Sequence, residues 1–581
     1  MFAGIETVTL HRAAVVAAGL LALAVLWRLD ASGRVGRRLR ERFVLGVPWG
    51  TVVSVLLVLS VYLFVQGGLD YWYSPTVVPF TAWSYSYPLG MLTAAFSHSG
   101  AGHLVGNLVG TLTYGVVAEY AWGHYPRRRG VSTFSSWRTN PYVRAFVVFP
   151  AAVVVVGTLT SLFGLGPVVG FSGVVFAFAG FALVSYPLTT VLALVTGRVV
   201  NLTYNAFLNP VVGARSQPVF STPWFADIAI QGHAFGLLVG VLLGLWLVQR
   251  RGDDLPPVRR LWAGMLLFAV SQSLWAVYWY RGNSQYVLYR AGGLALVTLL
   301  ATLVVAAVHA SDSRPLAWLA RTADRGQPTE VGRADGGRPD ADRQSDDETV
   351  RGWLASLSSR QLAAALLLFS TAALAGPAVG VNLLTNADSG LDGPGVDVRD
   401  YRITYAEDVQ NEMVAVVDVE FFGETTTVDT SGVIVTSDER DIWTTAVSKS
   451  RLAFDGSVPV RVGGVGWRET LTATRQGWTV VGGDPVYRVT LTHDGETVPV
   501  YASPERQAGP VLAGHNVSFA ANATNFTVGV ETDSGVVRAP LPGKNETVTL
   551  AGIDFTREKR TIVARTTDGT ELRIAAKEQY E

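Results

Sequence analysis

The 581-residue sequence contains no cysteine, and only 16% of its residues are charged. The absence of cysteine excludes disulfides, thiol nucleophiles and cysteine-ligated metal sites. A soluble domain usually carries about a quarter charged residues. The low charge, together with apolar runs near 20 residues long, therefore indicates a protein that crosses a lipid bilayer several times.

Lysine is also scarce, with four residues among the 46 basic ones. The net charge of zero conceals an asymmetry. Residues after 382 carry 29 acidic against 18 basic side chains, a net of −11, and residues 1–382 carry the complementary +11. A basic membrane part and an acidic tail suggest two compartments, and we expect no nucleic-acid partner.

Ten apolar segments are predicted to span the membrane, so we expect a polytopic α-helical membrane protein. They are residues 9–28, 46–66, 102–122, 142–163, 172–186, 187–207, 228–249, 260–280, 290–309 and 360–382. Arginine clusters at 34–42, 127–129 and 250–260 fall in alternate loops, which the positive-inside rule assigns to the cytoplasm. Both termini then lie outside the cytoplasm, in a multi-pass protein of the plasma membrane.

Residues 164–207 are too long for one span, because 44 helical residues would extend about 66 Å at ~1.5 Å each. Tyr186-Pro187 offers the break, with proline in a first turn where its missing N–H costs little. The helix from Ser172 is then short, about 21 Å, and begins below the membrane surface. Arg198 falls inside the next span, and the sequence does not place it.

The remaining segments define the expected domain organisation: residues 1–45 hold an extra span and a cytoplasmic loop, and residues 251–310 hold two more spans. Residues 311–358, rich in Asp, Arg, Gly and Ser, are expected to form a disordered cytoplasmic linker before a final span at 359–382. Residues 390–581 alternate short β-rich runs with Gly, Asp and Asn turns, which predicts an extracytoplasmic all-β domain resembling a sandwich. Its predicted strands include Met413–Phe422.

Polar side chains are costly in a bilayer, so the motifs that contain them need partners or a function. The first motif is His98-Ser-Gly-Ala-Gly-His103-Leu-Val-Gly-Asn107, in which His103 and Asn107 share a helical face. Alone, such a pair is more often a hydrogen-bonding device between helices. The second motif, Gly170-Phe-Ser172-Gly173, opens a helix, where free N–H groups and the positive dipole suit an oxyanion. A lone serine beside glycine is more often a packing residue.

The third motif is Gly232-His233-Ala-Phe-Gly236, which continues to Gly240 and Gly244. Glycines every four residues allow another helix to approach closely. The Ser172 helix, with Gly173, Ala177 and Gly180, is the expected partner. That contact would bring His233 to Ser172.

The three motifs together, in this order and on separate spans, closely resemble the rhomboid family over about residues 46–250, a six-helix core. The resemblance implies an intramembrane serine protease, a hydrolase with Ser172 as nucleophile and His233 as base. It implies that His103 and Asn107 form the oxyanion hole, with His98 in a supporting role. Gly170, Gly173, Phe176, Gly236 and Gly240 complete the expected site.

Two features depart from the family pattern. Phe176 stands where a tyrosine usually stacks on the catalytic histidine, so stacking survives and a hydroxyl is lost. Leu89-Gly90 occupies about the place of an expected Trp-Arg pair in the first outer loop. That loop, residues 67–96, is rich in aromatic residues and is predicted to lie at the membrane interface. Its aromatic residues include Trp72, Tyr73, Trp83, Tyr85 and Tyr87.

We expect transmembrane protein substrates with small or helix-breaking residues near the cut, and neither a metal nor a cofactor. Three alternatives remain open. An inactive rhomboid-like protein would bind membrane clients, although such proteins generally lack the Ser-His dyad. A transporter would show inverted repeats and paired broken helices. A receptor function of residues 390–581 could coexist with proteolysis.

Overall fold

The computed structural model describes residues 2–29, 33–126, 131–212, 219–226, 228–282, 285–311, 313–315, 355–384, 391, 393–411, 420–421, 424–425 and 428–581. Three sequence predictions fall wholly or mostly outside these residues. They are the linker 311–358, the strand Met413–Phe422 and the arginines at 127–129.

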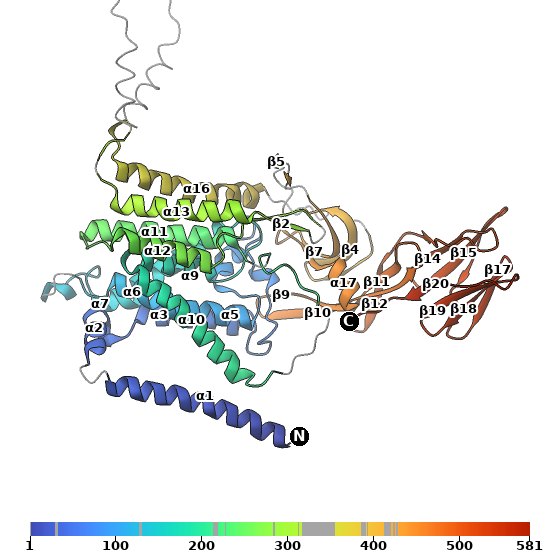
Figure 1. Ribbon diagram of the computed structural model, residues 1–581, viewed down its shortest axis with the longest axis horizontal. Coiled ribbons are helices and arrows are strands. Elements are labelled where there is room, and N and C mark those ends of the chain that lie inside the picture. Colours follow the sequence, from blue (N-terminus) through green and yellow to red (C-terminus); the bar gives the residue numbers. More distant parts are fainter. Residues whose placement is uncertain are drawn as a thin grey trace, which may run out of the picture.

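Ten helical segments occupy the positions of the ten predicted spans in the described part of the chain (Figure 1). They are α1 (Phe2–Leu29), α3 with a π-helical end (Trp49–Val65), α5 (Ala101–Gly110) continuing through a π-helical turn into α6 (Val116–Trp122), α7 and α8 (Pro141–Leu162), α9 (Ser172–Ser185), α10 (Pro187–Leu208), α11 (Ile230–Arg251), α12 (Val258–Ser271), α13 (Arg290–His309) and α16 (Ser359–Leu384). Shorter helices are α2 (Arg34–Arg42), α4 (Pro88–Thr93) and α17 (Lys449–Asp455). Tyr186 is non-helical, so the predicted break between α9 and α10 is confirmed.

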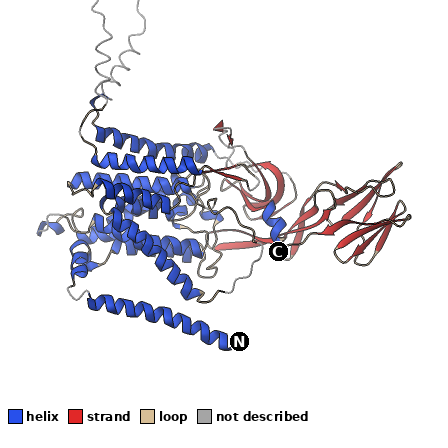
Figure 2. Cartoon of the chain, viewed as in Figure 1, coloured by secondary structure: helices blue, strands red, loops and turns tan. Residues whose placement is uncertain are grey.

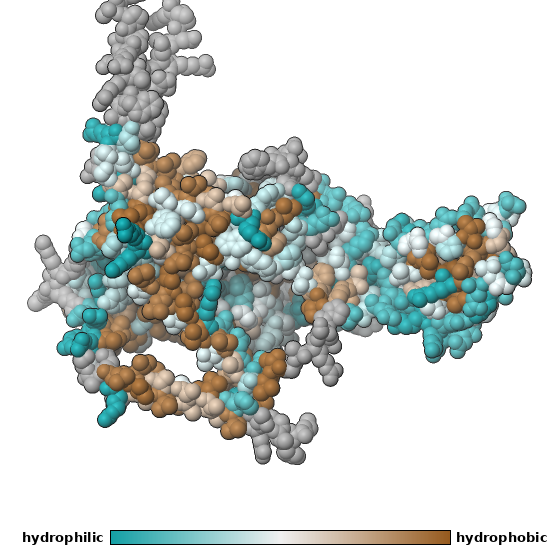
Figure 3. All heavy atoms as spheres, in the orientation of Figure 1, coloured by the Kyte–Doolittle hydropathy of each residue, from teal (hydrophilic) through white to brown (hydrophobic). Residues whose placement is uncertain are grey.

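Six of these helices are long and apolar enough to cross a membrane, and two shorter apolar helices accompany them. The six are Val8–Leu26, Pro141–Leu162, Pro187–Leu208, Ile230–Arg251, Arg290–His309 and Ser359–Leu384, and the shorter ones are Trp49–Val65 and Ser172–Ser185. Their outward side chains include Leu192, Leu299 and Leu368, all more than half exposed. Figure 3 shows apolar side chains over the helices and mainly polar ones over the C-terminal strands. The protein is therefore a polytopic helical membrane protein.

The span predicted at 260–280 is shorter than expected. Helix α12 ends at Ser271, and Ser273 has a positive φ of 59° that no helix continues. The chain then forms a hairpin of β1 (Tyr278–Tyr280) and β2 (Tyr286–Leu288) before α13 begins. Aromatic residues in this stretch favour strand over helix, which the apolar composition alone did not reveal.

Basic residues gather at the end of the helical bundle that is remote from the C-terminal strands. Arg251 donates hydrogen bonds to the carbonyl oxygens of Ala121 and Trp122, at 3.0 and 2.6 Å. Arg144 donates to the carbonyl oxygen of Gly123 at 2.9 Å. Figure 1 shows α2 at this end, while the N-terminus of α1 lies toward the strands.

A buried carboxylate, Glu119, ties α6 to the first turn of α3 at this same end. Its two oxygens accept hydrogen bonds from the N–H groups of Gly50 and Thr51 and from the Thr51 hydroxyl, each 2.7 Å long. These N–H groups have no intrahelical acceptor, so the carboxylate satisfies them and complements the helix dipole. His124 Nδ1 accepts from the Val44 N–H, so Nε2 carries the proton and donates to Glu119 over 2.5 Å.

The C-terminal region consists mainly of β-strands (Figure 2). Their side chains form two apolar cores. One antiparallel sheet has the order β3-β4-β7-β8, a second has β13-β14-β15-β16, and a third has β12-β11-β10-β20-β19-β18-β17 with β9 also paired to β10. The bounds are β3 (Gly395–Val398), β4 (Tyr401–Gln410), β7 (Asp429–Ser437), β8 (Ile442–Ser448), β9 (Ser457–Gly464), β10 (Trp467–Val480), β11 (Val486–His493), β12 (Glu496–Ala502), β13 (Arg506–Gln507), β14 (Val517–Ala521), β15 (Phe526–Thr532), β16 (Gly535–Pro540), β17 (Thr547–Leu550), β18 (Ile553–Glu558), β19 (Thr561–Thr566) and β20 (Glu571–Lys577), with a two-residue pair β5 (Glu420–Phe421) and β6 (Glu424–Thr425).

The predicted all-β character is thus confirmed, with one short helix, α17, added. The predicted single sandwich does not describe this region, because the strands form two separate apolar cores. Residues such as Val460 and Leu491 belong to one core, and Trp478 and Phe555 belong to the other. The long strand β10 runs from the first core into the second, so it joins the two parts.

Loop 67–96 packs against the β region, and the prediction that its aromatic residues lie at the membrane interface was wrong for two of them. Trp83 and Tyr87 are buried in the first β core, beside residues such as Tyr401. From β10, Arg468 stacks its guanidinium on Tyr71, 3.9 Å from the ring centroid, and donates to the carbonyl oxygen of Ser74. Tertiary contacts between distant segments decide this burial, and an aromatic count cannot reveal them.

Replacing Glu119 with alanine should lower the free energy of unfolding by about 3 kcal/mol or more, because three donors and His124 lose a buried acceptor. Thermal unfolding in detergent micelles would measure the loss, with Asp254→Ala, an exposed carboxylate, as the matched control. A Glu119→Ala protein as stable as the control would contradict the structural role.

Candidate active site

Helices α9 and α11 are in direct backbone contact through glycines. A methyl group on Gly236 would lie 2.1 Å from the carbonyl oxygen of Gly173, and one on Gly240 would lie 2.0 Å from that of Ala177. From the other side, a methyl group on Gly180 would lie 2.1 Å from the carbonyl oxygen of Leu237. No larger side chain fits these positions, so the predicted glycine contact between the two helices is present.

This contact places the Ser172 hydroxyl 2.8 Å from Nε2 of His233. Ser172 is the first residue of α9, and His233 lies in the first turn of α11. The hydroxyl can therefore donate to the imidazole, which is the arrangement that a serine nucleophile and its base require.

The His233 ring is held by stacking. Phe176, one turn after Ser172, lies parallel to it with ring centroids 4.3 Å apart and planes 12° apart. The other ring nitrogen, Nδ1, is buried and meets no hydrogen-bond partner in the described part of the chain. The arrangement is thus a dyad with an aromatic support, without a carboxylate that orients the base.

His103 and Asn107 face the segment that precedes Ser172. A methyl group on Gly170 would lie 2.5 Å from the His103 ring, and Gly170 has a φ of 127°, where a side chain is strained. The Asn107 amide nitrogen is buried and has no partner among the described residues. A buried donor without an acceptor lowers the stability of the fold. This donor lines the same cavity as Ser172.

His98 is fully buried, and its ring contacts that of His103 edge to face, with centroids 5.1 Å apart. Gln66 fixes the His98 backbone, because its amide oxygen accepts from the His98 N–H and its amide nitrogen donates to the His98 carbonyl, at 2.7 and 2.9 Å. His103 in turn contacts Ser99, with 3.1 Å between Nδ1 and Oγ. Gln66 was not among the residues predicted for the site, although a glutamine at the end of an apolar span is itself a signal.

A cavity of about 400 Å³, here called the Ser172 cleft, opens between α5, α9, α10 and the start of α11. Besides Ser172 and His233, its lining contains polar residues that the sequence analysis did not assign to the site. They are Thr113, Tyr114, Arg198, Asn201 and Gln272. A second, much smaller cavity of about 30 Å³ adjoins Ser172 on the other side and is lined mainly by small residues, including Ala94, Ala95, Gly170 and Gly173.

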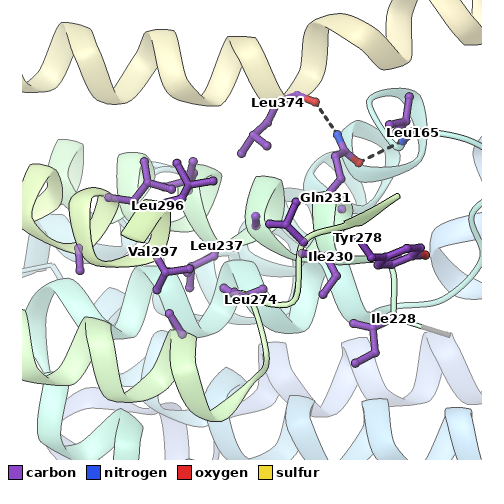
Figure 4. A pocket seen from close by; sticks show the side chains of 18 of the residues that line it. Leu165, Ile228, Ile230, Gln231, Leu237, Leu274, Tyr278, Leu296, Val297 and Leu374 are labelled. Atoms are coloured by element: carbon purple, nitrogen blue, oxygen red, sulfur yellow. Dashed lines mark hydrogen bonds between the residues drawn. The ribbon is translucent and has the colours of Figure 1, made fainter. Parts of the chain in front are cut away.

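A separate apolar cavity of about 410 Å³ lies between α11, α12, α13 and α16 (Figure 4). At its edge Gln231 accepts from the Leu165 N–H at 3.1 Å and donates to the carbonyl oxygens of Phe163 and Leu374 at 2.9 and 2.6 Å. One side chain thus joins α11, the loop before Ser172 and α16. This role of Gln231 was not predicted, because its partners are backbone groups distant from it in the sequence.

One group of potential metal ligands occurs in the described residues, and it lies in the β region. Glu469, His493 and Asp494 hold their ligand atoms within 4.8 Å of one another. His493 Nε2 is 3.6 Å from Glu469 and 4.0 Å from Asp494, distances typical of loose ion pairs.

Comparison with known proteins identifies the family. Residues 85–250 match the rhomboid domain, and neither the curated proteins nor the solved structures gave a match. The matched segment contains all three polar motifs and starts after α3. This polytopic helical membrane protein therefore contains a rhomboid domain over residues 85–250, which confirms the resemblance for that part of the chain; members of the rhomboid family are typically intramembrane serine proteases.

Substituting Gly240 with alanine should separate α9 from α11, because the new methyl group collides with backbone and not with a flexible side chain. We expect a loss of about 1–3 kcal/mol of stability from overpacking. Misplacing a reacting group by about 1 Å can cost 10²-fold, so labelling of Ser172 by a fluorophosphonate should slow at least about tenfold. The control is Gly380→Ala, a helical glycine of α16 with open space around it. Unchanged labelling in Gly240→Ala would contradict the dependence of the dyad on this contact.

Proposed function

We propose that the protein is an intramembrane serine endopeptidase that cleaves transmembrane segments of membrane proteins. The observation that carries the proposal is the 2.8 Å contact between Ser172 Oγ and His233 Nε2 at the wall of the Ser172 cleft. In this proposal Ser172 is the nucleophile, His233 is the general base, and His103 and Asn107 stabilise the oxyanion, with His98 behind His103. Gly170, Gly173, Gly236 and Gly240 allow the close approach, and Phe176 orients the imidazole.

The reaction follows from the placement of these groups. Ser172 Oγ attacks the scissile carbonyl carbon while its proton passes to His233 Nε2, so an ester bond begins to form as the imidazole becomes cationic. The oxyanion receives hydrogen bonds from the Ser172 N–H, which opens α9 without an intrahelical acceptor, and from His103 and Asn107. His233 then gives its proton to the leaving amine as the peptide bond breaks, and water hydrolyses the ester by the same steps in reverse order.

The length of α9 supports access of water to the dyad. Its 14 residues extend about 21 Å, against a hydrocarbon core of about 30 Å, so Ser172 begins below the membrane surface. The loop before it and the Ser172 cleft open toward the end of the bundle that carries the β region. The chemistry uses no cofactor and no metal.

The small cavity beside Ser172 supports a small side chain at the cleaved bond. At about 30 Å³ it has room for about one water molecule or a methyl group. Its glycine and alanine lining excludes large side chains next to the nucleophile. Family resemblance points in the same direction, toward small or helix-breaking residues near the cut.

The second candidate function is that of an inactive family member that binds membrane clients. Two observations argue against it and favour catalysis: the Ser172–His233 contact and the Asn107 amide, which has no partner among the described residues. A client-binding protein has no need for either feature.

We also propose that the protein lies in the plasma membrane with residues 390–581 outside the cytoplasm. The basic end of the bundle, with Arg144 and Arg251, fits the cytoplasmic side, and the acidic β region lies at the other end (Figure 1). The rhomboid core is proposed to extend over residues 46–250, since α3 is locked to α6 by Glu119.

Ser172→Ala and His233→Ala should each abolish cleavage of a transmembrane reporter in proteoliposomes, because each removes half of the dyad. Both should unfold at temperatures close to that of the wild type, and the Asp254→Ala protein should remain active. Fluorophosphonate labelling of the wild type but not of His233→Ala would show an activated serine. Equal cleavage by wild type and Ser172→Ala would reject the proposal.

The absence of cysteine makes the orientation directly testable. Ser534→Cys, in an exposed turn of the β region, should react with a membrane-impermeant maleimide in intact cells. Arg38→Cys, exposed on α2, should react only after permeabilisation. The reverse pattern would overturn the assignment of sides.

A further inference from the structure

Helix α10 brings one cationic side chain, Arg198, to the Ser172 cleft. Leu194, Gly197, Arg198 and Asn201 are the residues of α10 that line it. Their spacing of three and four residues forms one helical face. The cleft thus has the dyad on one wall and a guanidinium on another.

Arg198 lies at nearly the same depth as Ser172. Helix α9 runs to Ser185 and α10 returns from Pro187, so the two residues can be compared by counting from this turn. Ser172 is about 20 Å from it and Arg198 about 17 Å, at ~1.5 Å per residue. A substrate segment attacked by Ser172 therefore passes Arg198 close to the cut.

The charge of Arg198 has no ionic partner in the described part of the chain. Its Nη2 donates to the carbonyl oxygen of Ser271 at 2.9 Å, which leaves its other donors for a ligand. None of the residues that line the cleft is acidic. An arginine within a membrane span usually pairs with another group or serves a function.

Three more polar residues line the cleft near Arg198: Tyr114, Asn201 and Gln272. Gln272 donates to the Tyr114 hydroxyl at 3.0 Å, so this pair is internally satisfied. The side chain of Asn201, three residues after Arg198, forms no hydrogen bond with the described residues. Guanidinium and amide donors side by side suit a carboxylate, which can accept from both.

We propose that Arg198 is a specificity-determining residue that selects substrates with an aspartate or glutamate in the transmembrane segment, near the cleaved bond. This inference rests on the proposed protease function and names its substrate class. Taken as a sphere, the 400 Å³ cleft is roughly 9 Å across, which an extended chain spans in about three residues. The acidic side chain therefore lies within about three residues of the cut, and Arg198 neutralises a charge that the bilayer would otherwise disfavour.

The test uses pairs of transmembrane reporters that carry Asp or Asn at the same position, scanned over three residues on each side of the cut. Wild type should cleave the best Asp reporter with a kcat/KM at least about tenfold above its Asn partner, the size expected for a charge-assisted hydrogen bond. In Arg198→Gln, which retains a donor for Ser271, the ratio should fall to about one, because the Asp reporter loses its charged partner. Arg198→Lys should keep part of the preference. Arg290→Gln, which removes an arginine on α13 outside the cleft, should keep all of it.

A ratio near one at every position in the wild type, or a preference that persists in Arg198→Gln, would overturn the proposal. Binding of the same peptides to the Ser172→Ala protein separates this inference from the protease function. Tighter binding of the Asp peptide that disappears in the Ser172→Ala, Arg198→Gln double variant supports the subsite, even if the wild type cleaves no reporter. Equal binding of the Asp and Asn peptides refutes the subsite and leaves the dyad untouched.

Discussion

The close contact between α9 and α11 is the constraint on which the candidate site depends. Gly236 approaches Gly173, Gly240 approaches Ala177 and Gly244 approaches Phe181, so the contact advances along both helices in the same direction. The helices are therefore parallel, and both begin at the same end of the bundle. A hydroxyl at the first residue of one helix and an imidazole in the first turn of the other can then meet without any loop to position them. In a bilayer, where apolar burial between helices adds little, such backbone proximity supplies the van der Waals contact that holds the pair.

Parallel packing has an electrostatic consequence. The N-terminal ends of α9 and α11 both face the site, and each carries a partial positive charge from its free N–H groups. The combined field favours negative charge at the position of an oxyanion and disfavours a cation on His233 before attack. In the proposed reaction the imidazolium and the oxyanion form together. The field destabilises the imidazolium and stabilises the oxyanion, so its two effects offset each other. A proposed base that stays neutral before attack needs no buried carboxylate to stabilise a charge. The stacked ring of Phe176 is then sufficient to hold His233 in place.

The sequence was most informative where one residue type has one physical reason to be present. Glycine at four-residue spacing predicted the contact of α9 with α11, and Tyr186-Pro187 predicted the break after α9. It was least informative where the partner is a distant backbone group, as for Gln231 and Gln66, or where burial depends on another domain, as for Trp83. Arg198 was visible as an anomaly within a span, but its surroundings required the fold. The hairpin after Ser271 was missed because apolar composition does not separate helix from strand over a few residues.

The β region and the rim of the Ser172 cleft are physically linked through loop 67–96. Trp83 is buried in the β core, and the preceding residue, Ala82, donates its N–H to the carbonyl oxygen of Val168 at 3.0 Å. Val168 lies two residues before Gly170 and lines the small cavity beside Ser172. A displacement of the β region relative to the helices would have to break this backbone bond or expose Trp83. Because both are costly, the loop that carries Gly170 and the β region are constrained to move together. The geometry of the proposed oxyanion donors therefore depends on a domain that contributes none of them.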